Sequence, residues 1–222
     1  MQLTQIEFGS LLSYCPRGDS EPILRAREVR NVLKADGFVN NSSGSGQPIS
    51  MSEWVAHTMS QFRTRLPFSG FFAADSILVP TPSSSLLQPD SLWVPERVAN
   101  ALVKYGFGKE VVSCLKRTSA VRKAAYSRAE DRTKPVEHYQ SMGVQGSLNS
   151  ANEIVLVDDI VTRGATLLGA ANRLHDVFPA AKIRAFAVMR TISDPSEFRA
   201  FYDPRIGTIT YREEQGDTIR RP

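Results

Sequence analysis

Residues 154–166 read Ile-Val-Leu-Val-Asp-Asp-Ile-Val-Thr-Arg-Gly-Ala-Thr. The four apolar residues at the start of this stretch predict a short buried strand over 154–157. Two carboxylates, Asp158 and Asp159, follow where that strand is expected to end. Residues 162–166 predict a turn that opens a helix. The apolar side of this helix consists of Leu167, Leu168, Ala171, Leu174 and Phe178.

The turn between strand and helix has the composition of an anion-binding loop. Backbone N–H groups and the helix dipole at a helix N-terminus favour a phosphate. Thr162 and Thr166 add hydroxyl donors, and Gly164 lets the backbone approach a ligand closely. The carboxylates can accept hydrogen bonds from ribose hydroxyls, as acidic residues do in other nucleotide-binding folds. The stretch therefore indicates a site for a phosphorylated sugar; the alternative is a plain strand–helix turn whose Asp residues only cap the helix.

This order of residues resembles the phosphoribosyl-pyrophosphate (PRPP) signature of the type I phosphoribosyltransferases: an apolar strand, two acids, two apolar residues and Thr-x-Gly-x-Thr. The resemblance implies that Asp158 and Asp159 hold the ribose hydroxyls and lend negative charge to the reaction centre. It implies that the 5′-phosphate is bound by Thr162, Gly164, Ala165 and Thr166. Arg163 departs from the family, in which a small or hydroxylated residue is usual, and is expected either to contact phosphate or to crowd the loop.

Strands and helices alternate along the chain. Besides 154–157, strands are predicted at residues 76–79, 111–115 and 183–189. Helices are predicted at residues 21–34, after the capping box of Ser50–Glu53, and at 95–105. This alternation predicts an α/β fold with a doubly wound, mainly parallel central sheet, helices on both faces and a small hood from the flanking segments. Ligands of such sheets bind outside the carboxyl ends of the strands, at the switch point.

A second loop follows the strand at 76–79 directly and reads Pro80-Thr81-Pro82-Ser83-Ser84-Ser85. Backbone N–H groups and hydroxyls in such a turn can cradle a pyrophosphate, although an ordinary surface turn is the alternative. A strand followed by Pro-x-Pro resembles the pyrophosphate loop of the ComF-type phosphoribosyltransferase-like proteins. The resemblance implies that pyrophosphate is bound here by Thr81, Pro82, Ser83 and Ser84.

Residues 115–135 are rich in Lys and Arg, and only Glu130 and Asp131 oppose them. The order Leu-x-Arg, a Thr/Ser spacer and a later Arg resembles the ComF-type proteins, which implies a mobile basic loop that closes over pyrophosphate. Lys116 and Arg117 match its start and are expected to act in catalysis, and Arg132 matches the later Arg. No Gln follows the spacer as it does in those relatives. The alternatives are a solvated basic loop and a patch for a polyanion.

Length and composition set the limits. A chain of 222 residues with 41% apolar residues predicts a single domain with a full core. We expect this core at about 75–190, a helical extension at about 1–74 and a C-terminal hood or tail at 191–222.

No apolar run is long enough to span a membrane, and the N-terminus lacks the features of a secretory signal. The only cysteines, Cys15 and Cys114, suit a reducing cytosol, so a cytoplasmic location is expected. A net charge of +4 favours anionic ligands but does not by itself indicate nucleic acid.

Two sets of basic or titratable residues are expected to take no part in the chemistry. Arg25, Arg27 and Arg30 repeat at helical spacing, which predicts a solvated helix face, with contact to a substrate or partner as the alternative. The three histidines, His57, His138 and His175, lack metal-ligand neighbours in the sequence, so structural roles are expected for them and no metal held by the protein is predicted.

Taken together, the resemblance implies a PRPP-binding phosphoribosyltransferase that transfers the 5-phosphoribosyl group to a base or amine and releases pyrophosphate. Mg²⁺ would be carried mainly by the PRPP substrate. The sequence does not identify the acceptor. The alternative is a non-catalytic sensor of PRPP or a nucleotide that regulates a protein or nucleic-acid partner, and an accessory role in DNA uptake or repair rests on the ComF-type likeness alone. The sequence leaves open whether the protein forms a homodimer.

Overall fold

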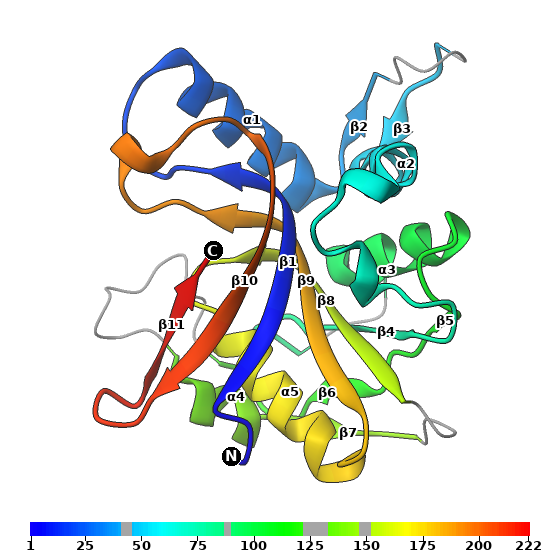
Figure 1. Cartoon of the computed structure of the whole chain (residues 1–222), viewed down its shortest axis with the longest axis vertical. Helices are drawn as coiled ribbons and strands as arrows, with labels where there is room; N and C mark the ends of the chain where they lie inside the picture. The colour runs from blue at the N-terminus through cyan, green and yellow to red at the C-terminus, as the bar shows by residue number, and fades with distance from the viewer. Residues whose placement is uncertain (41–45, 87–89, 122–132, 147–151) are drawn as a thin grey trace.

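A seven-stranded sheet, with strand order β11-β10-β1-β9-β8-β4-β5, organises the computed structural model (Figure 1). The model describes residues 1–40, 46–86, 90–121, 133–146 and 152–222. The strands of the sheet are β1 (Gln5–Tyr14), β4 (Ile77–Pro80), β5 (Glu110–Val111), β8 (Glu153–Val161), β9 (Lys182–Thr191), β10 (Tyr202–Arg212) and β11 (Asp217–Arg221). The neighbouring strands β1, β9, β8, β4 and β5 are parallel to one another. At the other edge of the sheet, β10 pairs antiparallel with β1, and β11 pairs antiparallel with β10. The predicted α/β fold with a mainly parallel sheet is confirmed.

Helices cover both faces of the sheet, which explains why β8 reads as an unbroken apolar run. Alternate residues of a strand point to opposite faces. Val155 and Val157 pack on the face covered by α2 (Met51–Gln61) and α3 (Val94–Lys104). Ile154 and Leu156 pack on the opposite face against α5 (Ala165–Val177). α4 (Pro135–Gln140) lies alongside α5.

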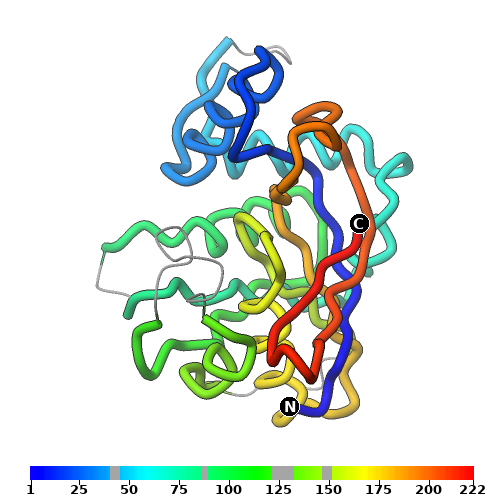
Figure 2. Tube along the Cα trace, turned by 90° about the vertical axis from the view of Figure 1, so that its left-hand side faces the viewer, coloured from blue at the N-terminus to red at the C-terminus, as the bar shows by residue number. Residues whose placement is uncertain are grey.

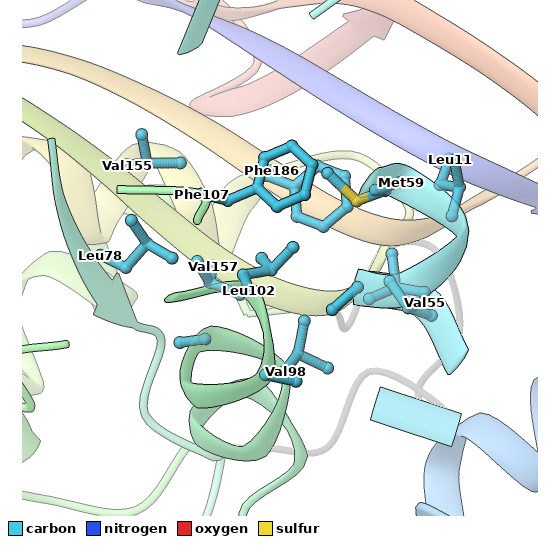
Figure 3. Packing of buried hydrophobic residues seen from close by; sticks show 14 of the residues in the cluster. Leu11, Val55, Met59, Leu78, Val98, Leu102, Phe107, Val155, Val157 and Phe186 are labelled. Carbon is cyan, nitrogen blue, oxygen red and sulfur yellow. The ribbon is translucent and has the colours of Figure 1, made fainter. Parts of the chain in front are cut away.

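The core on the α2–α3 face is rich in aromatic side chains. Phe72 makes edge-on contacts with Phe107 and Phe186, with ring centroids 5.3 and 5.5 Å apart. Figure 3 shows Phe107 and Phe186 among aliphatic residues from α2, α3 and the strands. Such contacts add to the burial of apolar area, so this face holds the strands of the site rigidly.

The smaller elements of the chain complete the fold. Two further sheets have two strands each: β2 (Phe38–Val39) with β3 (Ile49–Ser50), and β6 (Leu115–Arg117) with β7 (Met142–Val144). The remaining helices are α1 (Glu21–Ala35) and the short η1 (Arg63–Arg65), η2 (Ser69–Phe71) and η4 (Pro195–Glu197). The capping box at Ser50 is half formed, since the Ser50 hydroxyl accepts from the Glu53 N–H at 3.3 Å while the Glu53 carboxylate pairs with Lys104. Within the described part of the chain, no helix combines the length and apolar character that crossing a membrane requires.

Several predicted elements need correction. The strand expected at 111–115 is two strands, β5 in the central sheet and β6 in a separate one. The strand expected at 154–157 continues to Val161, because β9 is also long and pairs with it as far as Val161↔Arg190. The acid pair therefore lies within the strand instead of following it.

Both ends of the chain enter the central sheet. The segment expected as a helical extension supplies β1, which lies between β9 and β10. The segment expected as a hood or tail supplies β10 and β11. Figure 2 shows the β10–β11 hairpin, in red, running alongside β1, in blue. α1 lies beyond the carboxyl end of β1 (Figures 1 and 2).

The strand order places a switch point between β4 and β8. From β4 the chain proceeds through α3 to β5, toward one edge of the sheet, whereas from β8 it proceeds through α5 to β9, toward the other. Connections that diverge in this way leave a crevice at the carboxyl ends of the two strands. Thr81 follows β4 at this point, and its N–H donates to the Val157 carbonyl of β8 at 2.9 Å.

Candidate functional site

A cavity of about 530 Å³ lies at the carboxyl end of β8. One wall is the turn from β8 to α5, residues 162–166, all of which line the cavity. The opposite wall is the face of α1 that carries Arg27, Arg30, Asn31 and Lys34. The volume suits a nucleotide-sized ligand rather than a macromolecule.

The turn at 162–166 presents a helix N-terminus to this cavity. The first hydrogen bond of α5 runs from the Leu168 N–H to the Gly164 carbonyl at 2.9 Å. The N–H groups of the turn before Leu168 therefore have no acceptor within the helix. Thr162 shares a hydroxyl contact of 3.0 Å with Thr191 at the end of β9. This arrangement offers backbone and hydroxyl donors for an anion, as the sequence predicts.

Gly164 is required in this turn for two reasons. Its φ of 87° lies in the left-handed region, which residues with a Cβ rarely adopt. A Cβ at this position would also lie 2.6 Å from the side chain of Ile209 on β10. The turn at 162–166, the candidate phosphate loop, is therefore packed closely against the C-terminal hairpin.

The two acids of β8 have different surroundings because successive side chains of a strand point to opposite faces. Asp158 lines the cavity, and its Oδ1 accepts from the Thr81 hydroxyl at 2.8 Å and from the Asp159 N–H at 3.0 Å. Asp159 is buried and accepts from Lys34 of α1 at 2.6 Å. Asp158 is thus the acid that faces a ligand, and Asp159 fastens the α1 wall to the sheet.

Asp158 has a perturbed ionisation. Burial, followed by the negative charge of Asp159, raises the pKa of Asp158 to about 7. The hydrogen bond from Thr81 and the charge of Lys34 act in the opposite direction but do not cancel these effects. A carboxyl group with this pKa changes its charge in the physiological range, and perturbed groups of this kind cluster at functional sites.

Binding of a ribose phosphate is therefore expected to weaken as the pH falls from 8 to 6. Only the ionised Asp158 is a pure acceptor for ribose hydroxyls, and protonation removes it with a midpoint near 7. Calorimetric titration of ribose 5-phosphate across this pH range measures the effect. The second ionisation of the ligand's own phosphate falls near about 6, so Asp158→Asn is titrated with the same ligand. A pH dependence that is equal in both proteins would contradict the assignment.

The second predicted loop meets the site through one residue. Thr81 is buried, and its hydroxyl donates to Asp158. Its backbone carbonyl accepts from the Trp93 indole N–H at 2.8 Å. Pro82, Ser83 and Ser84 do not line the cavity. The Ser83 hydroxyl donates to the Ser85 carbonyl at 2.8 Å. Only Thr81 of the four residues expected to bind pyrophosphate therefore touches an acid of the site.

The two cations expected to act in catalysis are occupied elsewhere. Arg117 is buried and donates to the Ser83 carbonyl at 2.9 Å and to the Ser141 hydroxyl. Burial lowers the pKa of Arg117 to about 10, which leaves it charged at neutral pH. Lys116 lies over the ring of Trp93, with its Nζ 5.2 Å from the ring centroid. Neither residue lines the cavity, and the later Arg132 lies outside the described residues.

His138 connects Arg117 to the phosphate loop. Its Nδ1 lies 2.9 Å from an Arg117 nitrogen, and its Nε2 lies 3.3 Å from the Thr166 hydroxyl. Burial, with the charge of Arg117, lowers the pKa of His138 to about 3, so the ring is neutral. Because Arg117 can only donate, Nδ1 accepts and Nε2 carries the proton that faces Thr166. Thr166 then keeps its own hydroxyl proton for a ligand.

Arg163 pairs with Asp217 of β11 in this structure. Its side chain starts in the phosphate loop, and the residue lines the cavity. The departure from the family sequence thus coincides with an ion pair between the loop and the C-terminal hairpin, a partner that the sequence alone does not indicate.

The sequence reasoning missed the α1 wall. Arg27, Arg30 and Lys34 lie at helical spacing, and the sequence predicts a solvated face for the arginine cluster. The structure instead turns Arg27 and Arg30 toward the cavity, beside Tyr14 of β1. His138, which the sequence assigns a structural role, also lines it. The helical spacing of these basic residues was a signal for a shared face of α1. Only the packing of α1 over β8 shows that this face is a wall of the cavity and not a solvated surface.

Comparison with known proteins adds little to this geometry. No family model and no curated protein matches the sequence. Among solved structures, the fold is similar to that of an alanine mutant from an analysis of an invariant aspartic acid in HPRTs. The two chains are 12% identical, with a TM-score of 0.32, and the match covers 86% of this chain and 94% of the other. That TM-score is too low to support a function, so the interpretation below rests on the residues of the cavity.

Proposed function

We propose that this protein binds PRPP and transfers its 5-phosphoribosyl group to a nitrogen of an acceptor base or amine. In this reaction the bond between C1 of the ribose and the pyrophosphate oxygen breaks, and its electron pair leaves with pyrophosphate. The acceptor nitrogen forms the new bond to C1 and loses its proton. The proposal draws on the resemblance of residues 154–166 to the type I phosphoribosyltransferases.

One observation carries the proposal: Asp158 and the turn 162–166 line the same cavity at the switch point of the sheet. A phosphorylated ribose needs donors for its phosphate and an acceptor for its hydroxyls. The helix N-terminus with Gly164 supplies the first, and the half-buried carboxylate of Asp158 supplies the second. A plain strand–helix turn would need only one capping side chain.

The residues take the following roles in the proposed reaction. Thr162, Ala165 and Thr166 hold the 5′-phosphate with backbone and hydroxyl donors. Asp158 accepts from a ribose hydroxyl and lies where positive charge develops at the ribose. Asp159 acts through Lys34, by keeping α1 over the site.

Mg²⁺ would supply charge neutralisation on the phosphates of the substrate. Among the described residues, no group of three His, Cys, Asp or Glu could hold a metal ion. The donor chemistry nevertheless fits a substrate-borne ion. Oδ1 of Asp158 accepts from Thr81 and from the Asp159 N–H, so among the described residues Oδ2 is left for a hydroxyl or a hydrated cation. Mg²⁺ commonly binds through one or two carboxylates together with substrate phosphates.

Calorimetry tests the binding half of the proposal, and pyrophosphate release tests the catalytic half. We expect PRPP and ribose 5-phosphate to bind in millimolar Mg²⁺, and ribose without phosphate to bind far more weakly. A panel of bases and amines is then added to the PRPP complex, and pyrophosphate is measured. Absence of heat with PRPP, ribose 5-phosphate and nucleoside monophosphates would refute the proposal. The matched control is Lys109→Gln, which removes an exposed cation that does not line the cavity.

A second candidate is a PRPP or nucleotide sensor without catalytic activity. The observation that favours it is the commitment of Arg117 to the Ser83 carbonyl and to α4, away from the cavity. A transferase needs cations near its leaving group, and a binder does not. Tight PRPP binding without pyrophosphate release for any acceptor would select the sensor.

A further inference from the structure

In the part of the chain that the structure describes, four Lys or Arg side chains line the cavity, and three of them already have strong partners. Arg27 donates to the carbonyls of Cys15 and Gly18 at 3.0 and 2.5 Å. Lys34 and Arg163 each form an ion pair with an aspartate, as described above. Their charges are therefore largely used in holding the walls of the site together.

Arg30 differs from these three. Its Nη1 donates to the neutral Asn31 side chain at 3.0 Å, and its Nε is buried without a partner among the described residues. Its guanidinium carbon lies 5.9 Å from the ring centroid of Tyr14, which also lines the cavity. A buried donor without a partner is costly, so it is typical of a group that a ligand completes.

The position of Arg30 separates it from the phosphate loop. Lys34 fixes the register of α1 over the sheet through its 2.6 Å contact with Asp159. Arg30 precedes Lys34 by one helical turn, which is about 6 Å along the helix axis. It therefore lies on the α1 wall, whereas residues 162–166 form the opposite side. A molecule next to the ribose of a bound ribose phosphate would face the α1 wall.

We propose that Arg30 binds the carboxylate of the acceptor, so that the acceptor is a small base or amine that carries one carboxylate group. This inference rests on the proposed function. A guanidinium matches a carboxylate through two parallel N–H···O bonds. One unpaired arginine balances one negative charge, whereas an additional phosphate on the acceptor would bring up to two charges into a cavity that already receives the 5′-phosphate and the pyrophosphate of PRPP. Tyr14 beside Arg30 offers a flat apolar surface for the rest of the acceptor.

The test uses two pairs of probes: nicotinate with nicotinamide, which differ in charge but little in shape, and orotate with uracil, which lacks the carboxylate group of orotate. Each is titrated into the protein in the presence of ribose 5-phosphate and Mg²⁺. We expect at least one carboxylate to bind about ten- to a hundredfold more tightly than its neutral partner. Arg30→Gln is expected to reduce this ratio to about one, and Arg30→Lys to restore part of it.

Two further measurements keep the outcomes distinct. Arg25→Gln, a change to an exposed arginine of the same helix that does not line the cavity, is expected to leave the ratio unchanged. Affinity for ribose 5-phosphate alone is expected to be similar in Arg30→Gln and in the wild type. If Arg30→Gln weakens ribose 5-phosphate as much as the carboxylates, Arg30 is a phosphate contact and the inference is overturned.

Failure of this inference can be told from failure of the proposed function. If ribose 5-phosphate binds but every charged probe binds no better than its neutral partner, the acceptor is not selected through Arg30 and PRPP binding stands. If ribose 5-phosphate does not bind, the proposed function fails. The probes are then titrated into the free protein, where a charge preference lost in Arg30→Gln supports the anion site and its absence overturns it.

Discussion

Replacing both acids of β8, by Asp158→Asn with Asp159→Asn, is expected to reduce PRPP binding below detection while the fold persists. Asp158 faces the cavity, and the change removes the charged acceptor for the ribose. Each lost charge-assisted hydrogen bond is expected to cost about 1.5–3 kcal/mol. Asn can still accept from Thr81 and from the backbone, so the strand keeps its local hydrogen bonds. Calorimetric titration measures the affinity, and circular dichroism checks the fold.

The single variants separate the two acids. Asp158→Asn is expected to act on the ribose directly, whereas Asp159→Asn acts by releasing Lys34 from its 2.6 Å contact. Lys34→Met breaks the same contact from the other side, but it also removes a cation that lines the cavity and that lowers the pKa of Asp158. Lys34→Met should therefore weaken binding more than Asp159→Asn does, because Asp159→Asn leaves that cation in place and removes a charge that raises the pKa of Asp158. Equal PRPP affinity in the double mutant and the wild type would mean that the acids only shape the turn.

The second large effect is expected on stability, from Gly164→Ala. Alanine in the left-handed region costs about 1–2 kcal/mol, and forcing a methyl group into a packed site costs about 1–3 kcal/mol more. The φ of 87° and the 2.6 Å approach to Ile209 create both costs at this one residue. We expect the free energy of unfolding to fall by roughly the sum, measured as a lower midpoint in urea without a change in slope.

A double-mutant cycle with Ile209→Ala separates the two causes. Ile209 is fully buried, so its truncation is itself destabilising, by about 2–5 kcal/mol. In that background the clash is gone, and Gly164→Ala should cost only the backbone term of about 1–2 kcal/mol. Identical costs of Gly164→Ala in both backgrounds would show that the packing against Ile209 contributes nothing.

Part of the site could be predicted from local sequence because its residues are neighbours in the chain. The apolar run before Asp158, the acid pair and the turn at 162–166 lie on one strand–turn–helix unit. The apolar pattern of a strand, the capping of a helix and the conformational freedom of Gly164 are local properties. Each of them can be recognised from a few neighbouring residues in the sequence. The structure confirms the strand, the turn and the helix, although β8 extends to Val161.

The strand order was beyond local reasoning. β1, β10 and β11 carry no strong signal of their own, and their pairing joins residues from opposite ends of the chain, such as Phe8 with Gly207. The same holds for the pairing of Arg163 with Asp217 and for the contact between Ile209 and the phosphate loop. These contacts join residues that are far apart in the chain, so the pattern of neighbouring residues does not predict them.

By itself, the sequence determined the α/β class and the strand–acid–turn–helix unit, because these follow from the spacing of neighbouring residues, and it predicted a site for a ribose phosphate. Only the tertiary structure decided which cations face the cavity. It turned Arg117 inward to α4, tied Lys34 to Asp159 and left Arg30 beside Tyr14 with a buried donor. These side chains carry the same charge, but they differ in how available that charge is to a ligand. Burial and bonding partners decide this availability, and both are set by packing between distant segments.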